Sequence, residues 1–166
     1  MLNTVDVARY FISKDIDGSL FNKELMEREG RKFYSGNARL NKYLQLAQNI
    51  YIAKTGKPLM DATFYAYDNG AVEPRVRENY VALLSNRNNF LSSIPEEERV
   101  FLDKFYKAFE HATIEELIEL SHEDVAWQKK HRFYNKCDQK MDTTEYTDEY
   151  IEQYGDMVKI LDTMEP

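Results

Sequence analysis

The chain has 166 residues, enough for one domain with a substantial buried core. Hydrophobic residues make up 43% and charged residues 31%, a composition that excludes extensive disorder. The formal charge of −7 disfavours binding to nucleic acid by the molecule as a whole. A single cysteine cannot form an internal disulfide, and no apolar run approaches the roughly 20 residues of a membrane span. We therefore expect a cytoplasmic protein without a membrane segment.

The N-terminal part predicts two short helices and an extended segment. A cap at Thr4, followed by apolar residues at helical spacing, predicts a helix that ends near Lys14. Residues 15–18 then form an expected turn. A second short helix is expected over residues 20–29, where a glycine follows, and residues 31–34 are expected to be extended.

The middle of the chain holds the clearest helical pattern, over residues 39–54. One stripe of this segment is apolar and consists of Leu40, Tyr43, Leu44, Ala47, Ile50 and Tyr51. Such a wide stripe predicts a helix at the centre of the core, and Gly56 is a typical stop. Further on, Asn69-Gly70 lies between two short runs rich in β-forming residues, which favours a small hairpin.

The second half contains several helix starts. Pro74 suits a first helical turn, and Pro95 precedes three glutamates that favour the positive end of a helix dipole. Thr113 opens a capping box, and Ser121 begins a segment that can cap a further helix. A C-terminal amphipathic helix is expected over residues 142–164.

Together these elements predict a mainly α fold. We expect a compact single-domain bundle of six or seven short helices spanning residues 1–166, with at most a small β-hairpin. No internal repeat, low-complexity segment or long linker interrupts the pattern. The number of short amphipathic segments indicates one shared core, because none of them can bury its apolar face alone.

The turn after the first helix permits a calcium-site alternative. If Ser13 is placed at the first position of an EF-hand loop, Asp15, Asp17 and Glu24 fall at the third, fifth and twelfth positions. However, the first ligand should be an aspartate, and no second loop is present. A polar turn is therefore the favoured interpretation, with calcium binding as a minor alternative.

Other chemistry-bearing residues form no recognised pattern. His111, His122, His131 and Cys137 lack the close paired spacing of structural zinc sites, and Cys137 stands in no nucleophile signature. No glycine-rich phosphate loop occurs. We therefore expect no catalytic residue, no cofactor and no bound metal. An uncharacterised enzyme or metal-binding protein that uses His122 or Cys137 remains the alternative.

Charge is segregated near the C-terminus. Residues 129–140 are basic and contain aromatic side chains, which would suit a phage regulatory protein that contacts nucleic acid. Residues 142–158 carry six acidic side chains and no basic one, so they would repel phosphates. A polarised surface that steers a protein partner is the favoured interpretation.

Three stretches of the sequence are similar to a known family. They are Val7–Phe11, the segment from Gly36 through Lys57–Leu59 to Pro74, and Glu119–Trp127. Together they resemble the Panacea domain, also called the SocA-like antitoxin or phage-associated protein family. The resemblance includes the helix pattern Leu-x-Lys-x-Leu-x-x-Ala-Gln at residues 40–48 and covers most of residues 4–130. The turn at residues 68–72 and the longer connection over residues 15–36 depart from the family pattern.

The resemblance implies a non-catalytic protein-binding module. Such a module would be an antitoxin or proteolytic adaptor that neutralises a cognate protein toxin, is associated with a prophage or mobile element, and has a protease or chaperone as a further partner. The residues that match the family motifs are Lys42, Gln48, Asn69, Gly70, Glu73, Pro74, His122 and Trp127. We expect them to contact the partner or to fix turns and core, with the structural role favoured.

Overall fold

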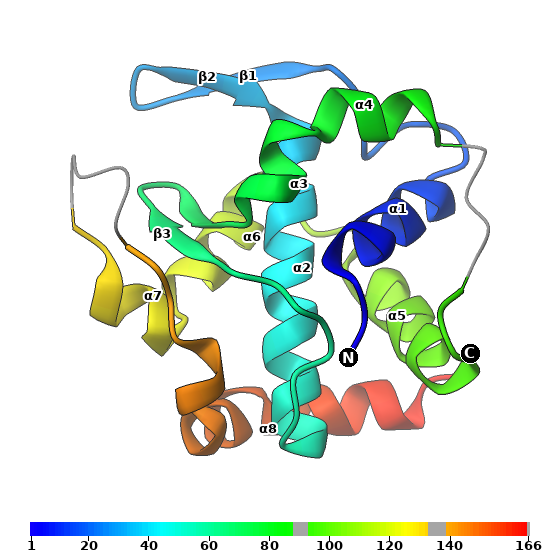
Figure 1. The fold of residues 1–166 in the computed structure, drawn as a ribbon, viewed down its shortest axis with the longest axis vertical. Helices are drawn as coiled ribbons and strands as arrows, with labels where there is room; N and C mark the ends of the chain where they lie inside the picture. Colours follow the sequence, from blue (N-terminus) through cyan, green and yellow to red (C-terminus); the bar gives the residue numbers. More distant parts are fainter. Residues whose placement is uncertain (88–92, 133–138, 166) are drawn as a thin grey trace.

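The computed structural model describes residues 1–87, 93–132 and 139–165. Over these residues the chain forms eight α-helices, one short 3-10 helix and two antiparallel hairpins (Figure 1). The prediction of a mainly helical fold is therefore confirmed. None of the helices in these ranges has both the length and the apolar character needed to cross a membrane.

The helices and strands follow one another with short connections. The helices are α1 (Thr4–Lys14), α2 (Ser35–Thr55), α3 (Pro74–Glu78), α4 (Tyr80–Ser85), α5 (Glu96–Phe109), α6 (Ile114–His122), α7 (Val125–Lys130) and α8 (Thr147–Thr163). The 3-10 helix η1 (Thr143–Glu145) precedes α8. The strands are β1 (Leu25–Arg28), β2 (Arg31–Tyr34), β3 (Tyr65–Tyr67) and β4 (Gly70–Val72). β1 pairs with β2, and β3 pairs with β4.

Helix α2 is the central element, as its apolar stripe predicted. In Figure 1 it runs through the middle of the molecule, with α1 and α5 on one side, α6 and α7 on the other, and α8 across its end. Fourteen of its 21 residues are buried, so the helix is covered on nearly every face. Six of the buried side chains are polar or charged: Arg39, Asn41, Lys42, Gln45, Gln48 and Asn49. The polar face of α2 is therefore part of the interior.

Aromatic side chains fill the space between α1, α2 and α5. The ring of Tyr43 meets those of Phe11 and Phe105 edge-on, with centroids 5.4 Å and 5.5 Å away. The Tyr43 hydroxyl donates to the carbonyl of Phe109 at 2.9 Å, so its polar end is also satisfied. Edge-to-face packing of this kind adds to the stabilisation from burial alone.

The C-terminal helix α8 packs mainly against α2. Tyr150, Tyr154 and Leu161 are buried, and they belong to the same core cluster as residues of α1, α2 and α5. The helix begins at Thr147 instead of near 142, because residues 143–145 form the separate turn η1. Since α8 shares the core with the N-terminal helices, we propose that residues 1–166 form one domain.

The prediction of a short helix over residues 20–29 is wrong. Two backbone N–H groups, of Leu20 and Phe21, donate to the Asp15 carboxylate at 3.0 Å and 2.8 Å, and these bonds fix a turn. Residues 25–28 then form strand β1. Both residues of its turn to β2, Glu29 and Gly30, have positive φ, which is the conformation that two-residue hairpins require. The extended segment expected over residues 31–34 is confirmed as β2.

The predicted helix starts agree closely with the observed ones. The capping box at Thr113 is complete, with both of its reciprocal hydrogen bonds to Glu116 present. Pro74 occupies the first turn of α3. The cap of α1 is Asn3, one residue before the expected Thr4, and the cap of α7 is Asp124, the last residue of the expected capping segment that begins at Ser121. Local side-chain to backbone bonding therefore defines most helix boundaries in this chain.

Candidate functional site

The polar side chains of α2 hold the loops that cross it. Gln48 is buried, and its Nε2 donates to the carbonyl of Met60 at 2.9 Å. Its Oε1 accepts from the N–H groups of Leu59 and Met60 at 2.8 Å and 3.0 Å. The amide of Gln48 thus satisfies three backbone groups of an irregular segment that passes through the interior. This motif residue is placed as a structural clamp.

About two turns earlier on α2, two side chains hold strand β4 and the residue that follows it. Lys42 Nζ donates to the carbonyl of Ala71 at 3.1 Å, and Asn41 Oδ1 accepts from the N–H of Glu73 at 2.8 Å. Lys42 is only 3% exposed. Burial, together with the charges of Arg77 and Arg28, lowers the pKa of Lys42 to about 7. The ammonium and amine forms of Lys42 therefore coexist near neutral pH.

Gly70 allows the β3–β4 hairpin to lie against α2 and α6. Its φ of +108° is unfavourable for residues with a side chain. A Cβ at this position would lie 2.4 Å from Ser121 Oγ and 2.8 Å from Lys42 Cε. Ser121 Oγ accepts from the N–H of Ala71 at 2.9 Å, so a hydrogen bond holds the hairpin close to α6. The predicted hairpin around Asn69-Gly70 is confirmed, with Asp68 and Asn69 as its two turn residues and Gly70 as the first residue of β4. The glycine is required by its positive φ and by tertiary packing.

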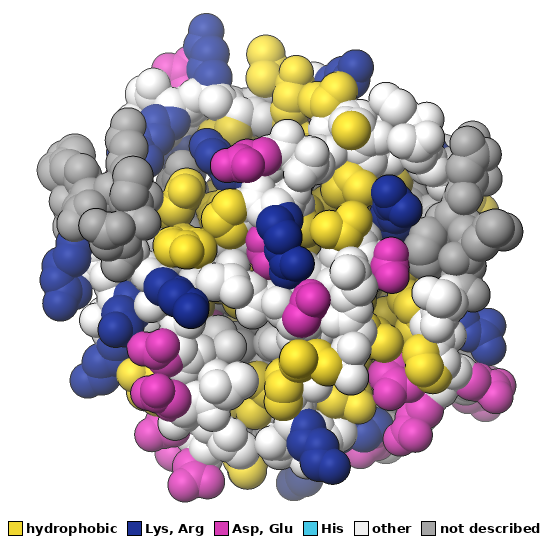
Figure 2. Space-filling model, in the orientation of Figure 1, with side chains coloured by type: hydrophobic (Ala, Val, Ile, Leu, Met, Phe, Trp, Pro, Cys, Tyr) yellow, Lys and Arg dark blue, Asp and Glu magenta, His cyan; other side chains and the backbone are white. Residues whose placement is uncertain are grey.

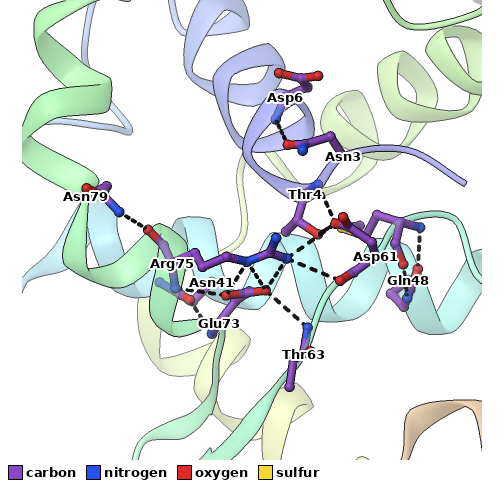
Figure 3. Close-up of polar contacts among 11 residues, drawn as sticks. Asn3, Thr4, Asp6, Asn41, Gln48, Asp61, Thr63, Glu73, Arg75 and Asn79 are labelled. Atoms are coloured by element: carbon purple, nitrogen blue, oxygen red, sulfur yellow. Dashed lines mark hydrogen bonds and ion pairs between the residues drawn. The ribbon is translucent and has the colours of Figure 1, made fainter.

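Glu73 and Arg75 form a polar cluster where α3 begins (Figure 3). The buried Glu73 carboxylate accepts from the N–H of Arg75 at 2.8 Å and from the N–H of Thr63 at 3.1 Å. Arg75 Nη2 lies 2.8 Å from Glu73 Oε2 and 3.3 Å from Asp61 Oδ1. Asp61 in turn accepts from the N–H and hydroxyl of Thr4. The cluster therefore ties the start of α1 to the start of α3.

Trp127 is stacked between two histidines. Its ring lies 4.2 Å from the ring of His122 and 4.3 Å from that of His131, both in stacked geometry. Its Nε1 donates to the carbonyl of Tyr67 at 2.9 Å. Trp127 is 9% exposed, so this three-ring stack packs the β3–β4 hairpin onto α7. Both motif residues, His122 and Trp127, thus contact the hairpin.

Asp68, at the tip of the same hairpin, joins three elements. His122 Nε2 lies 2.9 Å from its carbonyl oxygen, and because a carbonyl only accepts, this nitrogen carries the proton. Burial lowers the pKa of His122, which favours the neutral ring. The Asp68 carboxylate contacts His131 Nε2 at 2.8 Å and Arg31 of β2 at 2.7 Å. The two hairpins are linked through this carboxylate.

Asp124 is another buried carboxylate, at the end of the capping segment expected from Ser121 onward, and its side-chain partners were not predicted. It caps α7 by accepting from the N–H of Ala126 at 2.9 Å. It also accepts from the side chains of Gln45 at 2.9 Å, Asn49 at 2.8 Å and Tyr150 at 2.7 Å. Burial, and secondarily the Asp124 charge, raises the pKa of Tyr150. The sequence feature that could have indicated this role is an aspartate at a helix-cap position between Ser121 and Trp127.

A small pocket opens between the two hairpins and α2. Its volume is about 130 Å³, and its polar lining residues include Arg31, Lys32, Lys42, Asn69 and Arg77. The Asn69 Oδ1 atom is buried and has no hydrogen-bond partner among the described residues. Two of the motif residues, Lys42 and Asn69, therefore line the same pocket as three cations from β2 and α3, a grouping that no sequence pattern indicated.

Two residues of the calcium alternative, Asp15 and Asp17, bind other groups of the protein. Asp15 binds backbone N–H groups and forms an ion pair with Arg87 at 3.4 Å, and Asp17 Oδ1 accepts from the N–H of Ser19. Glu24 is exposed. The second helix that an EF-hand needs is replaced by β1.

The zinc and thiol alternatives involve residues that the structure separates. His111 is exposed, whereas His122 and His131 stack on Trp127. Over residues 1–87, 93–132 and 139–165, no group of three or more His, Cys, Asp or Glu side chains is arranged to hold a metal ion. Cys137 and residues 133–136 of the basic segment lie outside the described residues. Lys130, nearer the start of that segment, pairs with Asp142 at 3.3 Å.

These features define a small helical domain in which one central helix clamps a hairpin and several loops through buried polar side chains. The model of the family "Antitoxin SocA-like, Panacea domain" matches residues 40–128, which are 89 of the 166 residues. The chain therefore belongs to the SocA-like antitoxin family with a Panacea domain. Comparisons with curated proteins and with solved structures gave no match.

The matched range coincides with the clamped scaffold. It runs from α2 through α7 and contains all eight motif residues. Helix α1, the β1–β2 hairpin and α8 lie outside it.

Proposed function

We propose that this protein is an antitoxin that binds a cognate protein toxin and neutralises it without catalysing a reaction. The observation that carries the proposal is the family match over residues 40–128, with all of the motif residues inside the matched range. A cognate toxin as partner follows from the family. Association with a prophage or mobile element is part of the same proposal.

The chemistry of the scaffold supports binding over catalysis. Three carboxylates of the scaffold already have partners within the fold: Glu73 pairs with Arg75, Asp124 binds three side chains, and Asp68 binds Arg31 and His131. A catalytic acid or base instead needs access to a substrate proton. The net charge of −7 also favours a protein partner over nucleic acid.

Neutralisation has two forms, and they differ in what happens to the toxin. A masking antitoxin holds the toxin inactive in a stable complex. A proteolytic adaptor delivers the toxin to a protease, so its action needs that protease. We propose that the protein either masks the toxin or delivers it to a protease, and the experiment below distinguishes these two mechanisms.

The test is co-expression with the product of the neighbouring gene. Growth arrest by that product alone, with recovery and a co-purifying complex when this chain is present, is the expected result. Recovery that persists in a protease-deficient host supports masking, and recovery that disappears there supports delivery. Absence of both toxicity and a complex contradicts the antitoxin proposal. Elemental analysis for metal and a gel shift at low salt then test the enzyme and nucleic-acid alternatives.

A further inference from the structure

The pocket between the hairpins concentrates positive charge in an acidic protein. Arg31 and Lys32 come from β2, Lys42 from α2 and Arg77 from α3. Figure 2 shows Lys and Arg side chains around the β1–β2 hairpin at the top of the molecule, whereas Asp and Glu side chains gather mainly in the lower half of that face. The lining of the pocket therefore contains four cations and no carboxylate, although the formal charge of the chain is −7.

Several of these cations have no acidic partner in the described part of the chain. Arg31 pairs with Asp68, but no ion pair involves Lys32, Lys42 or Arg77 within the described ranges. The guanidinium of Arg77 lies over the ring of Tyr67, 5.4 Å from its centroid, which orients it beside the pocket.

Lys42 is the innermost of the cations. Its side chain is almost completely buried, and the single hydrogen bond that its Nζ makes to a described residue leaves donor capacity for another acceptor. A buried ammonium without a counter-ion is unfavourable, which is why the pKa of Lys42 falls to about 7. A bound anion would relieve this cost.

The pocket also offers an acceptor. The Oδ1 atom of Asn69 is buried and lacks a partner among the described residues, and Asn69 lines the pocket together with Lys42. A buried acceptor without a donor costs free energy. A peptide segment brings backbone N–H groups close to its acidic side chains, so it can satisfy both Asn69 and the cations.

The small size of the pocket favours the binding of a single side chain over that of a metabolite. Its volume of about 130 Å³ is well below the roughly 300–1,000 Å³ of pockets that enclose small-molecule ligands. Phe33 and Val72 add apolar walls that fit the methylene groups of a longer acidic residue. An acidic side chain from the surface of a folded partner can enter without a free chain end.

We propose that this pocket binds the carboxylate of a Glu or Asp side chain of the protein partner, held between Lys42 and Arg77 with Asn69 accepting from the partner's backbone. The proposal rests on the proposed function, because it assigns the contact surface of the antitoxin. The wall formed by Lys42, Asn69 and Val72 belongs to the family-matched scaffold, whereas Arg31 and Lys32 lie in the β1–β2 hairpin outside it. The hairpin therefore supplies the part of the pocket that lies outside the family-matched range.

The first test does not need the partner. The ¹⁵N-labelled protein is titrated with acetyl-Gly-Glu-Gly-amide and with acetyl-Gly-Gln-Gly-amide, and NMR follows the Trp127 indole and the amides of β3–β4. The expected result is at least tenfold tighter binding of the Glu peptide, since charge-assisted hydrogen bonds are lost with Gln. Equal shifts with both peptides, or no shifts, overturn the proposal. Tighter binding of inorganic phosphate, or of acetyl-Gly-Gln-Gly with a free carboxylate, also overturns the side-chain assignment.

Matched variants locate the binding. Arg77 is exposed, so Arg77→Gln should fold normally and weaken binding of the Glu peptide about fivefold or more. Lys42→Met keeps the buried apolar stem and should abolish it. Lys159→Gln removes an exposed cation from α8 and should leave binding unchanged. Equal effects of Arg77→Gln and Lys159→Gln would show a non-specific charge effect and contradict the pocket.

The second test uses the neighbouring-gene product. If the complex forms, Arg77→Gln and Lys42→Met should weaken it at least tenfold, while Lys159→Gln does not. A complex that tolerates both pocket variants overturns the pocket proposal and leaves the antitoxin proposal standing. If the neighbouring-gene product is not toxic and forms no complex with the wild-type chain, the antitoxin proposal fails, and the tripeptide titration still decides whether the pocket binds a carboxylate.

Discussion

The two hairpins have the same secondary structure and opposite environments. The three residues of β4 are all buried, and the hairpin that it forms with β3 is bonded by Lys42, Ser121, His122 and Trp127 from three different helices. The β1–β2 hairpin has no fully buried residue in either strand. One hairpin is thus an internal part of the core, and the other is presented on its surface.

The difference shows how a short hairpin is stabilised in each case. Three-residue strands cannot hold a hairpin by themselves, so β3–β4 depends on contacts with residues distant in the chain. The β1–β2 hairpin is longer and depends on its own two-residue turn, on the ion pair between Arg31 and Asp68, and on the contact between the rings of Tyr34 and Tyr80. Because the pocket lies between the two, it has one wall fixed by the core and one exposed wall.

Replacing the glycine in each hairpin should give the largest difference in the free energy of unfolding between the two hairpins. Gly70→Ala forces a Cβ into Ser121 and Lys42 at a φ of +108°, and it should cost about 3–5 kcal/mol of the free energy of unfolding. Gly30→Ala, at a φ of +77° with nothing within 4 Å, should cost only about 1 kcal/mol. Urea unfolding followed by the fluorescence of Trp127, the single tryptophan, measures both. Equal losses would refute the contrast between the hairpins.

Lys42 should make stability depend on pH in a defined window. Its pKa of about 7 in the folded protein lies below the unfolded value near 10, so the unfolded chain binds more protons between these values. Stability should therefore rise by about 2 kcal/mol from pH 7 to pH 9. Arg28 of β1, Arg77 of α3 and His122 of α6 are the charged or titratable groups that interact with Lys42.

The Lys42→Met variant is the control for this window. It should lose the rise between pH 7 and pH 9, because the titrating group is gone. His122 affects a lower range: burial lowers its pKa below the unfolded value, so its contribution is lost as the pH falls below about 6.5. Urea unfolding of both proteins at several pH values provides the measurement. An unchanged slope in Lys42→Met would assign the pH dependence to another group.

Removal of the link between the hairpins should have the smallest effect of the three. Asp68→Ala deletes the contacts to His131 and to the partly exposed Arg31, and it should cost about 1–2 kcal/mol. The emission of Trp127 should shift to longer wavelength as the His131 ring loosens. Glu27→Ala, on the exposed side of β1, should change stability by no more than about 0.5 kcal/mol. A silent Asp68→Ala would mean that the hairpins are independent.

The family resemblance identified residues whose roles only the structure distinguishes. Gln48, Glu73 and Pro74 hold loops or begin α3, and His122 and Trp127 pack the β3–β4 hairpin, so all five have structural contacts. Lys42 and Asn69 also border the pocket, which the motif did not reveal. The pocket could not be inferred because Arg31, Lys42 and Arg77 are distant in sequence and carry no shared periodicity.

The sequence by itself determined the mainly helical fold, the central helix, most helix boundaries and the hairpin around Asn69-Gly70. These features arise from local causes: the 3.6-residue period, caps such as Thr113, and residues that tolerate positive φ. Only the tertiary structure decided that residues 20–29 are not helical, that the polar face of α2 is buried, and that cations from three elements share a pocket. The physical reason is that burial of a polar side chain depends on distant partners, as with Gln45 and Asp124, which are 79 residues apart.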